Sequence, residues 1–370
     1  MKRTGLVWQE QFAWHSPGVA AAFLPPGGFV QPGDHVDHPE ARRRIVNLLE
    51  VAGVRRKLLS IDEIVPASRD ELMLFHTADY IDRIKALSDA GGGNAGDLTP
   101  FGPGGYEIAA LSAGAGIAAG RAVLEGRVRN AYVLNRPPGH HAEADKGRGF
   151  CIFGNGVITV RRLRQLFGLG KVALLDWDVH HGNGAQQAFY DDPSTLTISV
   201  HQYKFYPSDS GFIQENGVGP GVGFNINVPL PPGSGHGAYL HAFDTVVLPA
   251  LERFRPELIV VSCGFAGNAL EALGRTMASS ATYRWMTERV LDVADRICGG
   301  RLLLLQEGGF MQAYTPFCGL AVVEALSGID SGVADPYLHL IENMGMQELQ
   351  PHQAQMIDEA AGLLRHLARE

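Results

Sequence analysis

Short apolar runs alternate with longer amphipathic stretches through the middle of the chain. Runs of four to seven apolar residues between polar or glycine-containing segments are typical of strands that are buried on both faces. We identify five such strands, at 131–134, 171–177, 195–201, 258–263 and 301–306. Helical patterns accompany them at 106–125, 156–167, 237–254, 282–298 and 316–327. This alternation predicts an α/β fold with a central, mostly parallel sheet and helices on both faces.

The sequence shows no internal boundary. No charged linker and no change of composition divides the 370 residues, and the predicted strands are spread over the whole middle of the chain. We therefore expect a single domain that spans residues 1–370.

Polar and glycine-containing motifs follow all five predicted strands. In chain order they are NRPPGHHA, DWDVHHGNG, SVHQYKFYP, CGFAGN and QEGGF. Because the reactive groups of open α/β sheets gather beyond the carboxyl ends of the strands, we expect these motifs to meet at one edge of the sheet. The sequence therefore predicts one site there, built from histidine, aspartate and aromatic side chains.

The segment 176–184, DWDVHHGNG, carries the strongest local signal. Asp178 and His180 are two residues apart, so in extended backbone their side chains lie on one face. A carboxylate oxygen and an imidazole nitrogen can then bind one divalent cation. A polar strand end satisfied by hydrogen bonds would show the same spacing, and both interpretations remain open. Asp176 lies on the same face.

A second signal is the pair His140 and His141, which follows two prolines and a glycine. A histidine backed by a carboxylate holds its proton more firmly than one backed by a neutral amide, so such a pair can divide the acid and base roles. Asp176 and Asn183 are the candidates for the two backing partners. A capped loop is the competing interpretation of the dipeptide.

Composition and charge exclude several classes of protein. Lys and Arg number 31 against 39 Asp and Glu, and the net charge of −8 argues against a nucleic-acid partner. We find no apolar run of the roughly 18 residues that a membrane span needs and no apolar signal segment, so we expect a cytoplasmic protein with no membrane partner. The four cysteines are far apart, which indicates separate buried thiols in a reducing compartment.

Taken together, the motifs resemble those of the histone deacetylase family, and most closely its bacterial class II histone deacetylase-like amidohydrolases. The resemblance covers nearly the whole chain. It includes His38, Pro39, Glu40 and Arg42, then His76, Tyr80 and Ile81, and the segments 136–142, 149–153, 176–184, 227–230 and 316–320. It implies an arginase/deacetylase-like fold and a substrate that is an acyl-lysine or a small acylated amine. We also expect a homo-oligomer.

The resemblance implies roles for residues at the strand ends. It makes His140 and His141 the acid/base pair, oriented by Asp176 and Asn183. It also implies that Asp178 and His180 are two of the zinc ligands. Phe150 and Tyr206 are implied to form the aromatic walls of a substrate tunnel. Potassium is implied near Asp176, Asp178, His180, Ser199 and Val200, with a second site around Phe189, Asp192, Thr195 and Phe224.

Two positions depart from the family pattern, and both belong to the chemistry. Ala266 stands at the metal position where the family has its third zinc ligand, an aspartate, and Phe310 stands at the catalytic position of the oxyanion tyrosine. A catalytic zinc normally has three protein ligands, and losing one oxyanion donor costs roughly 10²–10³ in turnover. We therefore expect zinc binding and hydrolysis to be weak or lost, with Ala266 and Phe310 facing the pocket.

The sequence leaves three hypotheses open. The first is a deacetylase homologue that binds acylated amines and hydrolyses them weakly or not at all. The second is an active amidohydrolase with an unusual metal shell, and the third is a non-catalytic structural subunit. Cys263, Asn268 and Tyr206 are candidate substitutes for the missing groups, and we expect each of them to serve packing or the pocket rim instead.

Overall fold

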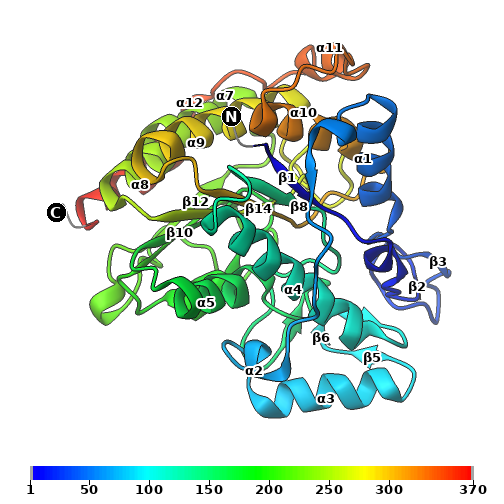
Figure 1. Ribbon diagram of the computed structural model, residues 1–370. Coiled ribbons are helices and arrows are strands. Elements are labelled where there is room, and N and C mark those ends of the chain that lie inside the picture. The colour runs from blue at the N-terminus through cyan, green and yellow to red at the C-terminus, as the bar shows by residue number, and fades with distance from the viewer. Residues whose placement is uncertain (1–2, 368–370) are drawn as a thin grey trace.

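A sheet of eight strands forms the centre of the computed structural model, which describes residues 3–367 (Figure 1). All neighbouring strands in it are parallel. The order across the sheet is β12 (Asn225–Leu230), β11 (Thr195–Gln202), β10 (Val172–Asp176), β13 (Leu258–Cys263), β14 (Leu302–Gln306), β8 (Ala131–Val133), β1 (Gly5–Val7) and β4 (Leu59–Ser60). The predicted α/β fold with a parallel central sheet is confirmed.

The five predicted strands correspond to β8, β10, β11, β13 and β14, and three further strands were missed. β1 and β4 have three and two residues, too few for a pattern. In β12 the side chains of Asn225 and Asn227 alternate with apolar ones, and Pro229 interrupts the run. Pro229 is tolerated because β12 lies at the edge of the sheet, where a missing N–H breaks fewer ladder bonds.

Alternate residues of the strands enter two separate cores. In β10, Ala173 and Leu175 belong to one hydrophobic cluster, whereas Val172 and Leu174 belong to the other. Successive side chains of a strand point to opposite faces, so a strand covered on both sides must be apolar throughout. This explains the continuous apolar runs in the sequence.

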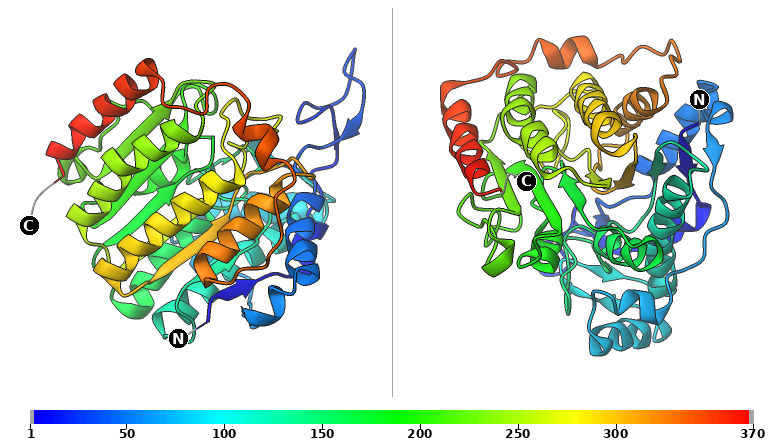
Figure 2. Two further views of the ribbon diagram at one scale, coloured as in Figure 1. Left: turned by 90° about the horizontal axis from the view of Figure 1, so that it is seen from above. Right: turned by 60° about the vertical axis from the view of Figure 1, so that its left-hand side comes forward.

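Helices cover both faces of the sheet (Figure 2). Residues on one face pack with α1 (Glu40–Val51), α7 (His236–Ala242), α8 (Leu248–Phe254), α9 (Ser280–Cys298), α10 (Thr315–Ser327) and α12 (Pro351–Gly362). Those on the other face pack with α3 (Ala78–Asp89), α4 (Gly105–Leu124), α5 (Asn155–Phe167) and α6 (Asn183–Phe189). The predicted helix 237–254 is divided into α7 and α8 by a π-helical turn at Phe243–Val247.

The remaining α-helices and strands of the described residues are short. They are the helices α2 (Arg69–Leu72) and α11 (Leu338–Glu342) and the two-residue strands β2 (Val19–Ala20), β3 (Gly33–Asp34), β5 (Gly93–Asn94), β6 (Gly96–Asp97), β7 (Pro100–Phe101) and β9 (Gly147–Arg148). The strands pair as β2 with β3, β5 with β7, and β6 with β9.

The helix α4 is long and apolar enough to cross a membrane by length and composition. Our expectation that no segment would reach this threshold was wrong, because the alanine, isoleucine, leucine and valine residues of α4 keep its average apolar. Most of the helix is buried inside the protein, packed against α5. Core helices of soluble proteins pass the same test, so this feature is weak evidence for a membrane span.

His76 joins the loop after α2 to the start of α5, and we expect it to make stability pH-dependent. Its Nε2 accepts the N–H of Gly154 at 2.9 Å, so its Nδ1 carries the proton that points to the carbonyl of Ala144 at 3.2 Å. Burial lowers the pKa of His76 from 6.5 to about 3. Below pH 6.5, His76 is therefore protonated in the unfolded chain but stays neutral in the folded protein. The free energy of unfolding falls as the pH drops from 6.5 towards 3.

In His76→Gln the side chain keeps one acceptor and one donor but does not titrate. We expect this variant to flatten the pH dependence by up to about 1.4 kcal/mol per pH unit between pH 6 and pH 4. Urea unfolding at a series of pH values measures the slope in both proteins. If the free energy of unfolding had the same pH dependence in both proteins, groups other than His76 would be responsible for the loss of stability in acid.

Candidate active site

One cavity opens at the carboxyl edge of the sheet, with a volume of about 220 Å³. The loops after all five predicted strands contribute to it, as expected from the parallel sheet. Its lining consists of Phe23, Leu98, Pro138, His140, His141, Gly149, Phe150, His180, Phe205, Tyr206, Leu273, Gly308 and Phe310. The structure thus brings the histidine pair, one of the two predicted zinc ligands, both tunnel residues and Phe310 to one place.

His140 is backed by a carboxylate, as predicted. Its Nδ1 lies 2.8 Å from Oδ2 of Asp176, and both side chains are buried. Burial by itself would lower the pKa of His140, but the negative charges of Asp176 and then Glu307 outweigh it and raise the pKa to about 10. His140 therefore carries a proton at neutral pH and can act as an acid.

His141 is backed by an amide. Its Nδ1 lies 2.8 Å from Oδ1 of Asn183, while Nδ2 of Asn183 donates to the carbonyl of His141 at 3.1 Å and to Glu143 at 2.8 Å. Because both N–H groups of the amide have acceptors, its oxygen must face the imidazole, and His141 Nδ1 is the donor. Burial and then the charges of His140 and His180 lower the pKa of His141 well below its usual value. A neutral His141 with a free Nε2 suits a base.

Glu143 is a residue of this site that the sequence analysis missed. Its carboxylate is held by Nη1 of Arg148 at 2.8 Å, and the guanidinium of Arg148 also contacts Asp209 at 3.1 Å. The only signal in the sequence was the place of Glu143 directly after the histidine motif. Through Asn183, this carboxylate selects the tautomer of His141.

We expect Glu143→Leu to change that tautomer. Without the acceptor, the side-chain amide of Asn183 can rotate by half a turn, so that its N–H group faces His141. The lost hydrogen bond to the charged Glu143 contributes about 1.5–3 kcal/mol, and its removal is enough to populate the rotated amide. The matched control is Glu143→Gln, whose amide oxygen can still accept from Asn183. Nitrogen-15 NMR of the histidine rings distinguishes the tautomers, and a His141 signal unchanged in Glu143→Leu would contradict this role.

Asp178 and His180, the two predicted zinc ligands, lie side by side. Oδ1 of Asp178 accepts from Nδ1 of His180 at 2.8 Å and from its backbone N–H at 2.9 Å, and Oδ2 accepts from the N–H of Gly308 at 2.8 Å. Burial would raise the pKa of Asp178, but its hydrogen bond with His180 and the charge of His140 lower it to about 2. The carboxylate is therefore ionised.

Ala266 lies next to this pair and gives it no third ligand. A Cβ placed on Gly308 would be 2.6 Å from Oδ2 of Asp178 and 3.1 Å from the methyl of Ala266, so these two residues are neighbours beneath Gly308. Ala266 is fully buried and packs with Phe150, Val179 and Phe310. The donors present do not make up the three-ligand set of a catalytic zinc.

Of the two positions that we expected to face the pocket, Phe310 lines the cavity, whereas Ala266 is fully buried beside Asp178. Among the described residues, those that line the cavity include Gly308, Phe310 and His180 but neither Ala266 nor Asp178, which lie close to Gly308. The candidate substitutes are engaged elsewhere. The thiol of Cys263 contacts the Tyr132 hydroxyl at 3.8 Å, and Nδ2 of Asn268 donates to the carbonyl of Phe265 at 2.8 Å.

Aromatic rings form the walls of the cavity. Phe310 meets Phe150 edge to face with ring centroids 5.6 Å apart, and Tyr206 meets His141 in the same way at 4.9 Å. The Tyr206 hydroxyl donates to Asp97 at 3.0 Å, so it belongs to the wall. Glu271, a second residue that the sequence did not assign to the site, accepts the backbone N–H of Phe310 at 2.7 Å and thereby positions its loop.

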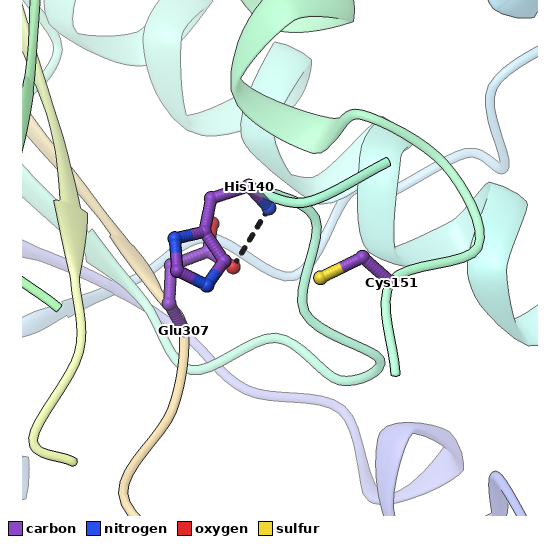
Figure 3. A group of neighbouring side chains, drawn as sticks. All are labelled: His140, Cys151 and Glu307. Carbon is purple, nitrogen blue, oxygen red and sulfur yellow. Dashed lines mark hydrogen bonds between the residues drawn. The ribbon is translucent and has the colours of Figure 1, made fainter. Parts of the chain in front are cut away.

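A further cluster of three side chains could hold a metal ion: His140, Cys151 and Glu307 (Figure 3). Their donor atoms lie within 4.8 Å of one another, and all three residues are buried. Glu307 accepts the backbone N–H of Gly139 at 2.7 Å, and burial raises its pKa to about 7. Burial also raises the pKa of Cys151 well above its usual value, which disfavours the thiolate that binds metals.

The neighbourhoods implied for potassium are hydrogen-bonded within the protein. Oγ of Ser199 lies 3.1 Å from Nδ1 of His181 and 2.9 Å from Nδ1 of His201. At the second place, the carboxylate of Asp192 accepts from Oγ1 of Thr195 at 2.7 Å and from Arg164 at 2.9 Å. The Arg164 guanidinium already supplies a positive charge there.

Comparisons with known proteins agree with this geometry. Residues 35–326 match the family model described as "Histone deacetylase domain". A "Histone deacetylase-like amidohydrolase" of Pseudomonas aeruginosa is 49% identical over 344 residues, which cover 92% of this chain and 90% of that protein. "Histone deacetylase clr3" of Schizosaccharomyces pombe is 36% identical over 80% of this chain and 46% of its own length.

A solved structure supports the same assignment. The structure described as "Crystal Structure of HDA15 HD domain" superposes with a TM-score of 0.81 and 28% sequence identity, over 98% of this chain and 96% of that one. Members of this family are generally zinc-dependent and act on acylated amines. On its sequence, its fold and the arrangement at the edge of its sheet, the chain belongs to the histone deacetylase family.

Proposed function

We propose that this protein binds acylated amines, either acyl-lysine or a small acylated amine, and hydrolyses them weakly or not at all. The observation that carries the proposal is the composition of the cavity. The histidine pair, its two backing partners and the aromatic walls lie together, and Ala266 and Phe310 stand where the family resemblance predicts a metal ligand and the oxyanion donor.

The proton-transfer part of the site is complete in this proposal. His141, neutral with a free Nε2, can accept a proton from a water molecule, and His140, protonated against Asp176, can donate one to the leaving amine. Proton transfer typically contributes about 10²–10⁴-fold to a rate. This by itself is a small part of what amide hydrolysis needs.

The groups that would polarise the acyl carbonyl are incomplete in this proposal. Asp178 and His180 are two donors where a catalytic zinc has three, and Phe310 has a ring without a hydroxyl. Removing one oxyanion donor alone costs about 10²–10³ in turnover. The walls made by Phe150 and Tyr206 do not depend on these groups, so ligand binding can persist without hydrolysis.

The second candidate is a working amidohydrolase with an unusual metal shell. The observation in its favour is the retained geometry of the His140–Asp176 and His141–Asn183 pairs, each at 2.8 Å. Potassium near Asp176 and Ser199, a homo-oligomeric state and a cytoplasmic location stay predictions that follow from the sequence and the family.

Three measurements on one preparation test the proposal: zinc content by elemental analysis, hydrolysis of a fluorogenic acyl-lysine, and calorimetric binding of acyl-lysine peptides. We expect saturable binding, much less than one equivalent of zinc and little or no turnover. Phe150→Ala should weaken binding, whereas Val51→Ala, at an exposed helix end, should not. Stoichiometric zinc with rapid turnover would favour the second candidate, and absence of binding would overturn the proposal.

A further inference from the structure

The guanidinium of Arg148 lies among acidic side chains from three segments beside the cavity. Its Nη1 donates to Glu143 at 2.8 Å, its Nη2 donates to Asp209 at 3.1 Å, and its Nε lies 3.8 Å from the carboxylate of Asp97. The side chain of Arg148 is 13% exposed, so its charge is only partly screened by water and salt. One positive charge thus joins three carboxylates that would otherwise repel one another.

Each of the three acidic segments also contributes to the lining of the cavity. Within three positions of its carboxylate, each segment has one lining residue that the chain order makes a close neighbour: Leu98, His141 and Tyr206. Arg148 is not one of the described residues that line the cavity. Any influence of its guanidinium on a ligand is therefore exerted through these neighbours.

The ring of Tyr206 is contacted from several sides. The guanidinium carbon of Arg148 lies 5.9 Å from its centroid, and its hydroxyl donates to Asp97 at 3.0 Å. On another side the ring meets His141 edge to face, with centroids 4.9 Å apart. A Cβ placed on Gly149 would be 2.7 Å from Cε1 of Tyr206 and 2.5 Å from Cδ2 of His141, so this glycine permits the two rings to approach each other.

We propose that Arg148 is a positioning residue, which holds the wall formed by Tyr206 against His141 by binding the three carboxylates together. Arg148 contacts the ring itself, and its pair with Asp209 holds the segment that carries the ring. Without the guanidinium, the like charges of the carboxylates favour separation of the three segments. The wall must then be ordered again each time a ligand binds.

The need to order a loose wall reduces affinity. For one aromatic side chain the cost of ordering corresponds to a loss of up to about tenfold in affinity, and we expect a loss of this size for acyl-lysine peptides in Arg148→Met. This expectation rests on the proposed binding of acylated amines. The state of the Tyr206 ring, in contrast, can be measured in the protein without a ligand.

The first measurement is NMR of the full-length protein labelled with carbon-13 at its tyrosines, in which the signal of Tyr206 is assigned by its loss in Tyr206→Phe. In Arg148→Met we expect this signal to move towards that of tyrosine in an unfolded peptide. Asp209→Ala, at a side chain that is 67% exposed, should move it in the same direction by a smaller amount. Arg127→Met, which removes a pair with Glu125 at the surface, is the matched control and should leave the signal unchanged.

The second measurement is a double-mutant cycle on the affinity for one acetyl-lysine peptide, by calorimetry. In this inference Asp209 acts on the wall through Arg148. Asp209→Ala should therefore weaken binding by the parent protein but have no further effect in Arg148→Met. A side chain that served only the general stability of the fold would not produce this dependence.

The outcomes separate this inference from the proposed function. A Tyr206 signal that is the same in the parent protein and in Arg148→Met, or additive effects in the cycle, would overturn the inference and leave the proposed function standing. Failure of the parent protein to bind any acyl-lysine would overturn the proposed function, and the NMR comparison would still decide the inference. If Arg148→Met does not fold, the presence or absence of the shift in Asp209→Ala decides it.

Discussion

Ala266→Asp is expected to raise the zinc content of the purified protein from a small fraction to nearly one equivalent. The new carboxylate would stand beside Asp178, beneath Gly308, and would complete a set of two carboxylates and one imidazole. Changes to groups that merely support metal ligands cost about 10–100-fold in affinity, so restoring a ligand should gain at least as much. Elemental analysis and competition with a chelator measure the gain.

Ala266→Asn is the matched control, since its amide has the same shape without the negative charge and is a poor zinc ligand. Phe310→Tyr alone should change hydrolysis little, because an oxyanion donor cannot replace the polarisation of the carbonyl. The double variant should exceed both single ones in acyl-lysine hydrolysis, since groups that act as a unit are strongly non-additive. A double variant with full zinc and no turnover on a broad acyl panel would place the defect elsewhere in the pocket.

Asp37→Ala is expected to lower the free energy of unfolding by about 3–5 kcal/mol, which is typical when one partner of a buried ion pair is removed. The Asp37 carboxylate lies 3.1 Å from both Arg42 and Arg136, and all three side chains are at most 1% exposed. Arg42 also binds the backbone carbonyl of Glu307 at 2.6 Å. The substitution would leave two guanidinium groups buried without a counter-charge.

Two variants calibrate this expectation in urea unfolding experiments. Asp37→Asn keeps an acceptor oxygen for the arginines and should be destabilised less than Asp37→Ala. Asp82→Ala breaks the solvent-exposed pair with Arg69 and should leave the unfolding midpoint unchanged, because exposed pairs contribute little. If Asp37→Ala had the same unfolding midpoint as Asp82→Ala, the buried ion pairs of Asp37 with Arg42 and Arg136 would not contribute to stability.

The sequence carried the information for the sheet and for most of the site because that information is local. A strand buried on both faces must be apolar throughout, so β10 and β13 were visible as runs. The residues at the ends of parallel strands meet at one edge, so the positions of His140, His180 and Phe310 along the chain were enough to assign them to one cavity. Short strands such as β1 and β4 contain too few residues for such a pattern.

The sequence by itself thus determined the fold class and the place of the site, and its resemblance to the family predicted the two positions, Ala266 and Phe310, at which the site departs from the family pattern. The tertiary structure alone decided which groups touch. Glu143 orients Asn183 from 40 positions away, and Arg42 binds Glu307 across 265. It also decided that Ala266 and Phe310 pack into one buried cluster with Phe150 and Val179, next to Asp178. Periodicity reports the environment of one segment, whereas contacts between distant segments depend on how the whole chain packs.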